Sequence, residues 1–134
     1  MTASGSPTGP RPADSTILVV DDDPAILTLV ERSLRAQGYR VWTATRAADA
    51  RNLLAELAGA VDLVLTDIEM PGGLGSELAR QIRSKQRWVR VLFMSSYSRE
   101  DLLKQGVDVP EGQLLNKPFV VSRLVDTVRT ALSG

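Results

Sequence analysis

The sequence predicts a single α/β domain, in which a doubly wound sheet of five parallel strands is flanked by five helices. Short apolar runs alternate with amphipathic stretches from Thr16 onward, which is the pattern of strands joined by helical crossovers. Several of the apolar runs lack polar alternation, as expected for strands that are buried on both faces. The length of 134 residues suits one domain. Right-handed crossovers then place helices on both faces of the sheet.

The N-terminal segment differs from the rest of the chain. Residues 1–15 are dominated by small residues, Pro and Gly, with little apolar surface to bury. We expect these residues to form a disordered tail or linker. The folded domain is therefore expected to span residues 16–133.

The first half of the domain contains three predicted strands. Ile17–Val20 is a compact apolar run, Arg40–Ala44 a second strand and Asp62–Thr66 a third. In the second strand, Val41 and the neighbouring Trp42 are the residues that could contact the core. Between the strands lie two helical stripes: one from Pro24 to Gly38, opened by Asp23 as N-cap, and one across Ala47–Leu57.

The second half of the domain continues the alternation with one weak element. Gly75–Lys85 is the third helix and Arg90–Met94 the fourth strand. Ser98–Gln105 supports only about two helical turns before the breakers Gly106, Pro110 and Gly112. Gln113–Leu115 is a short fifth strand. A clean helical period that opens at Pro118 predicts the last helix.

Composition excludes several classes of function. Sixteen basic and sixteen acidic residues leave no net charge that would draw the domain to nucleic acid or anionic lipid. The chain has no cysteine and no histidine, so it lacks thiolate chemistry and cannot itself supply a phosphohistidine. No apolar run reaches the length of a membrane span, and no secretory signal is visible, so we expect a cytoplasmic protein.

Carboxylates follow two of the predicted strands. Asp21 and Asp22 come directly after the first strand, and Asp67 ends the third, before a Pro-Gly loop. If the strand order is 2-1-3-4-5, an order known for doubly wound sheets, the three carboxylates meet at the switch point. Carboxylates packed closely repel one another unless a cation lies among them, and oxygen ligands of this kind suit Mg²⁺.

Polar residues also follow the last two strands. Ser95 follows the fourth strand, and Asn116 and Lys117 follow the fifth. A cation, a lysine and a hydroxyl are the groups that stabilise phosphoryl oxygens, and a carboxylate such as Asp67 can then act as nucleophile. Each residue taken alone has a structural explanation: an acidic run before Pro24 is commonly a helix N-cap.

Four motifs at these strand ends carry a family resemblance: Val19-Val20-Asp21-Asp22-Asp23-Pro24, Leu65-Thr66-Asp67-Ile68-Glu69-Met70-Pro71-Gly72, Phe93-Met94-Ser95-Ser96-Tyr97 and Asn116-Lys117-Pro118-Phe119. Their order and placement over about residues 16–132 resemble the receiver domain of two-component response regulators. The weak fourth helix resembles receivers associated with hybrid sensor histidine kinases. The resemblance implies a flavodoxin-like fold.

The resemblance also implies residue roles. Asp67 is implied as the phosphoacceptor, with Mg²⁺ held by Asp22, by Asp21, by Asp67 itself and by the backbone carbonyl of Glu69. Ser95 takes the place of the switch hydroxyl. Lys117 is the lysine that contacts the phosphoryl group, preceding a proline in a bond expected to be cis.

One position departs from the family pattern. The family often has an aromatic switch residue three positions before the lysine, where this chain has Leu114. The usual coupling of a switch hydroxyl to an aromatic ring is therefore in question here.

The implied function is a signalling receiver rather than an enzyme with external substrates. A partner histidine kinase or histidine phosphotransfer protein would donate the phosphoryl group to Asp67. The signal would then pass by contact to a downstream protein, without nucleic acid or membrane binding by this domain. The alternatives are an Mg²⁺-dependent phosphatase with an aspartyl nucleophile, which usually needs a second Asp where this chain has Glu69, and a degenerate receiver that only binds partners.

Overall fold

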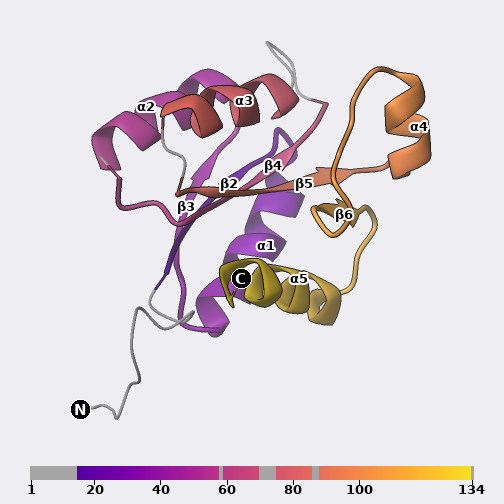
Figure 1. Cartoon of the computed structure of the whole chain (residues 1–134). Coiled ribbons are helices and arrows are strands. Elements are labelled where there is room, and N and C mark those ends of the chain that lie inside the picture. The colour runs from indigo at the N-terminus through magenta and orange to yellow at the C-terminus, as the bar shows by residue number, and fades with distance from the viewer. Residues whose placement is uncertain (1–14, 58, 70–74, 86–87, 134) are drawn as a thin grey trace.

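The computed structural model describes residues 15–57, 59–69, 75–85 and 88–133. The expected tail therefore lies outside the described residues, apart from Ser15, which is buried. Within the described part, five parallel strands form one sheet in the order β3-β2-β4-β5-β6 (Figure 1). The strands are β2 (Thr16–Val20), β3 (Arg40–Ala44), β4 (Leu63–Asp67), β5 (Arg90–Ser95) and β6 (Leu114–Asn116). When the five strands are numbered 1 to 5 by their order along the chain, so that β2 is the first, the sheet order is 2-1-3-4-5. The predicted fold class and strand order are therefore confirmed.

Helices cover both faces of the sheet (Figure 1). They are α1 (Pro24–Ala36), α2 (Ala47–Leu57), α3 (Gly75–Lys85), α4 (Arg99–Lys104) and α5 (Val121–Ser133). Helices α1 and α5 pack on one face, while α2 and α3 pack on the other. Helix α4 lies beyond the C-terminal end of β5, near the edge strand β6 (Figure 1).

The central strands are buried on both faces because their side chains alternate between two apolar cores. Ile17 and Val19 of β2 belong to the core under α1 and α5, and Leu18 and Val20 to the core under α2 and α3. All four side chains are fully buried. Burial of such a side chain contributes about 1.5–3 kcal/mol relative to exposure. This two-sided burial explains the absence of polar alternation in the sequence.

The ends of α1 follow the predicted signals. The Asp23 carboxylate accepts a hydrogen bond from the backbone N–H of Ala25 at 2.9 Å, and Pro24 occupies the first helical position. After the helix, Gly38 has φ of 96°, a left-handed conformation that favours glycine. The chain therefore leaves β2 and enters α1 within three residues, which fixes the carboxylates between them.

The fourth helix is short, as predicted. It has six residues, with Ser98 as N-cap accepting from the N–H of Asp101 at 3.0 Å. Leu102 is fully buried in the core under α2 and α3, whereas Leu103 is 60% exposed. Gly106, with φ of 83°, follows the helix. A single buried leucine thus anchors α4 to the domain.

Two details differ from the predictions. The last helix begins at Val121 rather than Pro118, because the Val120 carbonyl is its first acceptor, from the N–H groups of Arg123 (3.1 Å) and Leu124 (3.2 Å). In β3, Val41 is buried, but Trp42 keeps 46% of its surface exposed because β3 lies at the edge of the sheet that the described residues form. No helix among the described residues is long and apolar enough to cross a bilayer.

Candidate functional site

Three carboxylates meet at the C-terminal edge of the sheet. Asp21 and Asp22 follow β2, and Asp67 is the last residue of the neighbouring strand β4. One carboxylate oxygen from each lies within 4.8 Å of the others. The convergence predicted from the strand order is therefore found, at the switch point where ligands bind in open α/β sheets.

The carboxylate of Asp21 is fixed by both of its oxygens. Its side chain is fully buried. Oδ1 accepts a hydrogen bond from the backbone N–H of Asp23 at 2.9 Å, and Oδ2 accepts one from Nζ of Lys117 at 2.7 Å. Burial of a carboxylate is costly unless it is hydrogen-bonded and paired, and these two bonds offset that cost. The two hydrogen bonds of Asp21 thus connect the start of α1 to Lys117, the residue that follows β6.

Lys117 lies between two carboxylates. Its Nζ is 2.7 Å from Oδ2 of Asp21 and 3.5 Å from Oδ2 of Asp67, and the side chain is only 17% exposed. Burial acts to lower the pKa of Lys117, but the hydrogen bond and attraction of Asp21, together with the attraction of Asp67, outweigh it and raise that pKa. Lys117 therefore carries its positive charge at neutral pH.

Asp67 lies in a less favourable environment for a charge. It is 5% exposed. Burial and the negative charge of Asp21, with a smaller contribution from Glu69, raise its pKa to about 6, and Lys117 only partly opposes them. The net effect is a surplus of negative charge around Asp67 when all the carboxylates are ionised.

A divalent cation fits this surplus. Three carboxylate oxygens from Asp21, Asp22 and Asp67 are close enough to share one ion, and Asp22 is exposed, so the ion and its waters can reach the site from solvent. Hard oxygen ligands with room for waters are the preference of Mg²⁺. Such an ion would neutralise the charge of Asp21, which after burial is the next largest cause of the raised pKa of Asp67.

Ser95 is buried at the end of β5, one residue after Met94, which pairs with Asp67 in the sheet. Its hydroxyl donates to the Glu69 carboxylate, with Oγ 3.3 and 3.4 Å from the two carboxylate oxygens. The same oxygen accepts a hydrogen bond from the backbone N–H of Tyr97 at 3.0 Å. The structure therefore brings Ser95 to the site but directs its hydroxyl to Glu69.

Sequence reasoning did not assign a role to Asn116. Its Nδ2 donates to the carbonyl of Tyr97 at 2.8 Å and lies 3.4 Å from the carbonyl of Ser95. Its place directly before Lys117 in a strand-end motif was the only sequence signal. The Lys117–Pro118 peptide bond is cis, as the resemblance implied.

Comparison with known sequences shows which proteins the chain is similar to. The sequence profile of the response regulator receiver domain matches residues 17–129. The chain is 30% identical over 118 residues to sensor kinase CckA of Brucella abortus, covering 88% of this chain and 12% of that protein. It is 34% identical over 122 residues to two-component response regulator ARR2 of Arabidopsis thaliana, covering 91% and 18%. With transcriptional regulatory protein PrrA of Mycobacterium tuberculosis it shares 34% identity over 116 residues, covering 87% and 49%.

Solved structures show the same similarity. The receiver domain of hybrid histidine kinase CckA superposes with a TM-score of 0.73 at 31% identity, covering 88% of this chain and 99% of that one. Chemotaxis response regulator CheY4 of Vibrio cholerae gives 0.77 at 27% identity, covering 89% and 99%.

The fold and the match over most of the chain define a signalling domain of two-component systems. The chain belongs to the response regulator receiver domain family. Its predicted resemblance to receivers of hybrid sensor kinases is confirmed by the CckA matches. The chain spans 12% to 49% of the three curated relatives named above, so it corresponds to their receiver portion.

Proposed function

We propose that this domain accepts a phosphoryl group on Asp67 and signals by protein contact. One observation carries the proposal: Lys117 lies within 3.5 Å of Asp67 while Asp21 and Asp22 bring two more carboxylates to the same point. This arrangement combines a nucleophile, a fixed positive charge and a cation site. A buried aspartate with a purely structural role does not need all three.

The transfer step balances as a displacement at phosphorus. A carboxylate oxygen of Asp67 attacks the phosphorus of a donor phosphohistidine, an O–P bond forms and the P–N bond breaks. The imidazole leaves with the electron pair and takes up a proton. Since the chain contains no histidine, the donor histidine lies outside this domain. We propose a histidine kinase or histidine phosphotransfer protein in this role.

Mg²⁺ and Lys117 would both supply positive charge to the transferred phosphoryl group. Asp21, Asp22, Asp67 and the backbone carbonyl of Glu69 would hold Mg²⁺, which supplies positive charge to the phosphoryl oxygens when bound. Lys117, whose Nζ lies near both Asp21 and Asp67, supplies a second positive charge. Ser95 would contact a phosphoryl oxygen after its hydroxyl turns away from Glu69.

The remaining features describe a signalling domain. We propose that it acts on no substrate beyond its own aspartyl phosphate, that it contacts a downstream protein, and that it works in the cytoplasm. Its zero net charge gives no support for binding nucleic acid or a membrane through this domain.

Phosphorylation by a small donor tests the proposal. The protein is incubated with Mg²⁺ and acetyl phosphate, and its intact mass is measured with and without chelator. We expect a gain of one phosphoryl group that requires Mg²⁺, is lost in D67N and is kept in D49N, a matched change at an exposed aspartate of α2. An unchanged mass in the wild type, together with no response to beryllofluoride, would leave only a binding role. Sustained release of phosphate from many phosphomonoesters would instead indicate the phosphatase.

A further inference from the structure

Resting on the proposed function, we propose that Asn116 is a positioning residue, which ties the β5–α4 loop to the strand that carries Lys117 and so transmits the state of Asp67 to α4. Leu114 stands where the family often has an aromatic switch residue, so the usual aromatic connection to α4 is missing here. It packs against the core under α2 and α3, and it has no polar group or ring to couple to Ser95. A different connection from the site to α4 is therefore needed.

Tyr97 is that connection, because both of its backbone polar groups bond to residues at the site. Its N–H donates to Oγ of Ser95 at 3.0 Å. Its carbonyl accepts from Nδ2 of Asn116 at 2.8 Å. Of the residues that would contact a phosphoryl group, Ser95 is thus bonded directly to Tyr97, and Lys117 is linked to it through its chain neighbour Asn116.

The end of β6 that holds Asn116 is hydrogen-bonded to β5 and linked through Lys117 to Asp21. The backbone N–H of Lys117 donates to the carbonyl of Ser95 at 2.8 Å, which continues the β5–β6 ladder. The Lys117 side chain reaches back to Asp21. A shift of Lys117 toward a phosphoryl group on Asp67 would therefore shift Asn116 as well, and through its amide the carbonyl of Tyr97.

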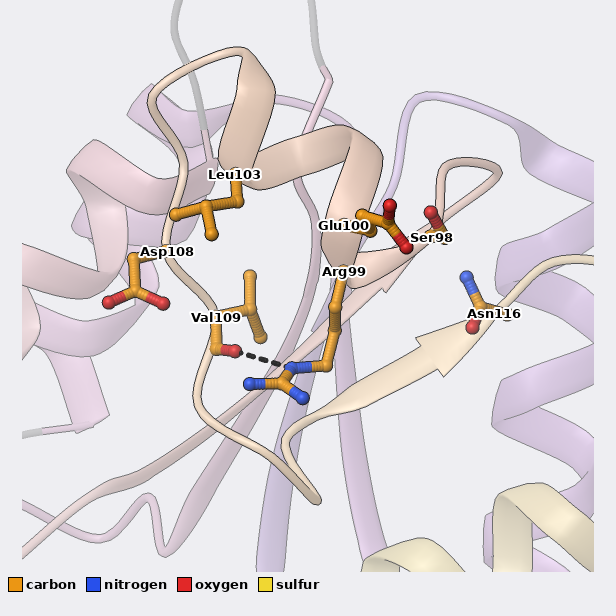
Figure 2. Close-up of a pocket in the computed structure, with 7 residues that line it drawn as sticks. All are labelled: Ser98, Arg99, Glu100, Leu103, Asp108, Val109 and Asn116. Carbon is orange, nitrogen blue, oxygen red and sulfur yellow. Dashed lines mark hydrogen bonds between the residues drawn. The ribbon is translucent and has the colours of Figure 1, made fainter.

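Helix α4 begins at Arg99, two residues after Tyr97. Ser98 caps the helix through its hydroxyl, so a displacement of Tyr97 moves the first turn of α4. Asn116 and Ser98 lie on the same side of a cavity of about 530 Å³ that is also lined by Arg99, Leu103 and Val109 (Figure 2). Nε of Arg99 donates to the carbonyl of Val109 at 2.8 Å across this cavity. The shape of the cavity therefore depends on where α4 starts.

When Ser95 turns toward a phosphoryl group, its Oγ leaves the N–H of Tyr97. The bond from Asn116 is then the remaining hydrogen bond of the two that tie Tyr97 to the site. An exposed hydrogen bond of this kind contributes little to overall stability. Loss of Asn116 should therefore reduce the coupling to α4 without removing the fold or the phosphorylation site.

Backbone amide NMR shifts on adding beryllofluoride with Mg²⁺ to the full chain test this inference. In the wild type we expect large shifts at residues next to Asp67 and at α4, including Arg99 and Leu103. In N116A, the site shifts should remain with the same half-saturating beryllofluoride concentration within about twofold, while the α4 shifts fall to less than half. N52A, a matched change at an exposed residue of α2, should keep both.

The outcomes separate the inference from the proposed function. If α4 shifts as strongly in N116A as in the wild type, or does not shift in the wild type although the site does, the inference is wrong. If the site itself is silent in the wild type, the proposed function fails, and the inference fails with it. If N116A folds poorly, N116D takes its place in the test. It keeps the size of the side chain but removes the donor to Tyr97, so it should show the same loss of α4 shifts.

Discussion

Nζ of Lys117 is closer to Oδ2 of Asp21, at 2.7 Å, than to Oδ2 of Asp67, at 3.5 Å. The lysine therefore neutralises Asp21 first and Asp67 only in part. The pKa of Asp67 reflects this, since burial and the charge of Asp21 raise it to about 6 in spite of the lysine. In the proposed function, the lysine is held near the nucleophile without being its main partner, which leaves Asp67 free for chemistry.

Replacement of Lys117 tests this relationship. K117M would leave Asp21, which is fully buried, and Asp67 without their positive neighbour. Breaking a buried ion pair on one side is strongly destabilising, so we expect a loss of about 2–4 kcal/mol in metal-free buffer at pH 7. Saturating Mg²⁺ should recover part of the loss, because the cation neutralises the same carboxylates. Urea denaturation with and without Mg²⁺ measures both effects.

The control for this experiment is K104M, at an exposed lysine in the last turn of α4. Its effect should stay within about 0.5 kcal/mol and should not depend on Mg²⁺. Equal losses in the two variants would contradict the central position of Lys117. We also expect K117M to fold and to lose the response of α4 to beryllofluoride.

Asp67 should be a source of instability in the metal-free protein. Its pKa is raised from 3.8 to about 6 on folding, so folding favours the protonated acid. The corresponding stability is present below pH 3.8 and is lost as the pH rises through about 6. A difference of about two pH units corresponds to about 3 kcal/mol, so D67N should be more stable than the wild type by about 1–3 kcal/mol at pH 7.

The pH dependence distinguishes the cost of ionising Asp67 from a stabilisation of D67N that has another cause. The advantage of D67N should shrink from pH 7 to pH 4 in chelated buffer, measured by urea denaturation at each pH. D49N, at an exposed aspartate of α2, is the comparison variant measured at each pH. Saturating Mg²⁺ at pH 7 should stabilise the wild type more than D67N. A pH-independent advantage for D67N would show that ionisation of the buried Asp67 carboxyl is not its cause.

Much of the fold could be predicted because strand and helix signals were local. The apolar run at Ile17–Val20, the Asp23 cap and the period of α5 each fixed an element without reference to its neighbours. A proline at the first helical position, as in α1, also predicts a helix start at Pro118. In the structure α5 begins three residues later, at Val121, because the carbonyl of Val120 is the first helical acceptor. The exposure of Trp42 depends on β3 being an edge strand, which its own sequence does not reveal.

The candidate site was predictable to the extent that its residues sit at strand ends. Parallel strands bring their C-terminal ends to one edge, so the order of the strands was enough to gather Asp21, Asp22 and Asp67. Side-chain directions were not predictable in this way. The bond from Ser95 to Glu69 and that from Asn116 to Tyr97 depend on local rotamers and on loop geometry after the strands.

Asp22 should contribute to Mg²⁺ binding and little to the fold. Its carboxylate is exposed but lies within 4.8 Å of those of Asp21 and Asp67. D22N should therefore weaken Mg²⁺ binding about tenfold or more, because a charged ligand is lost, with almost no change in metal-free stability. D23N is the matched control: Asp23 caps α1, and asparagine is an equally good cap. Calorimetric titration with Mg²⁺ compares the two, and equal affinities would argue against Asp22 as a ligand.

The attachment of α4 should depend on one leucine. Leu102 is fully buried in the core under α2 and α3, and its neighbour Leu103 is 60% exposed at the cavity in Figure 2. Truncation of a buried leucine costs about 2–5 kcal/mol, so L102A should lower the free energy of unfolding by about 2–4 kcal/mol. L103A makes the same chemical change on the exposed side and should cost less than about 1 kcal/mol. Urea denaturation gives both values, and similar losses in the two variants would show that α4 is not held to the core through Leu102.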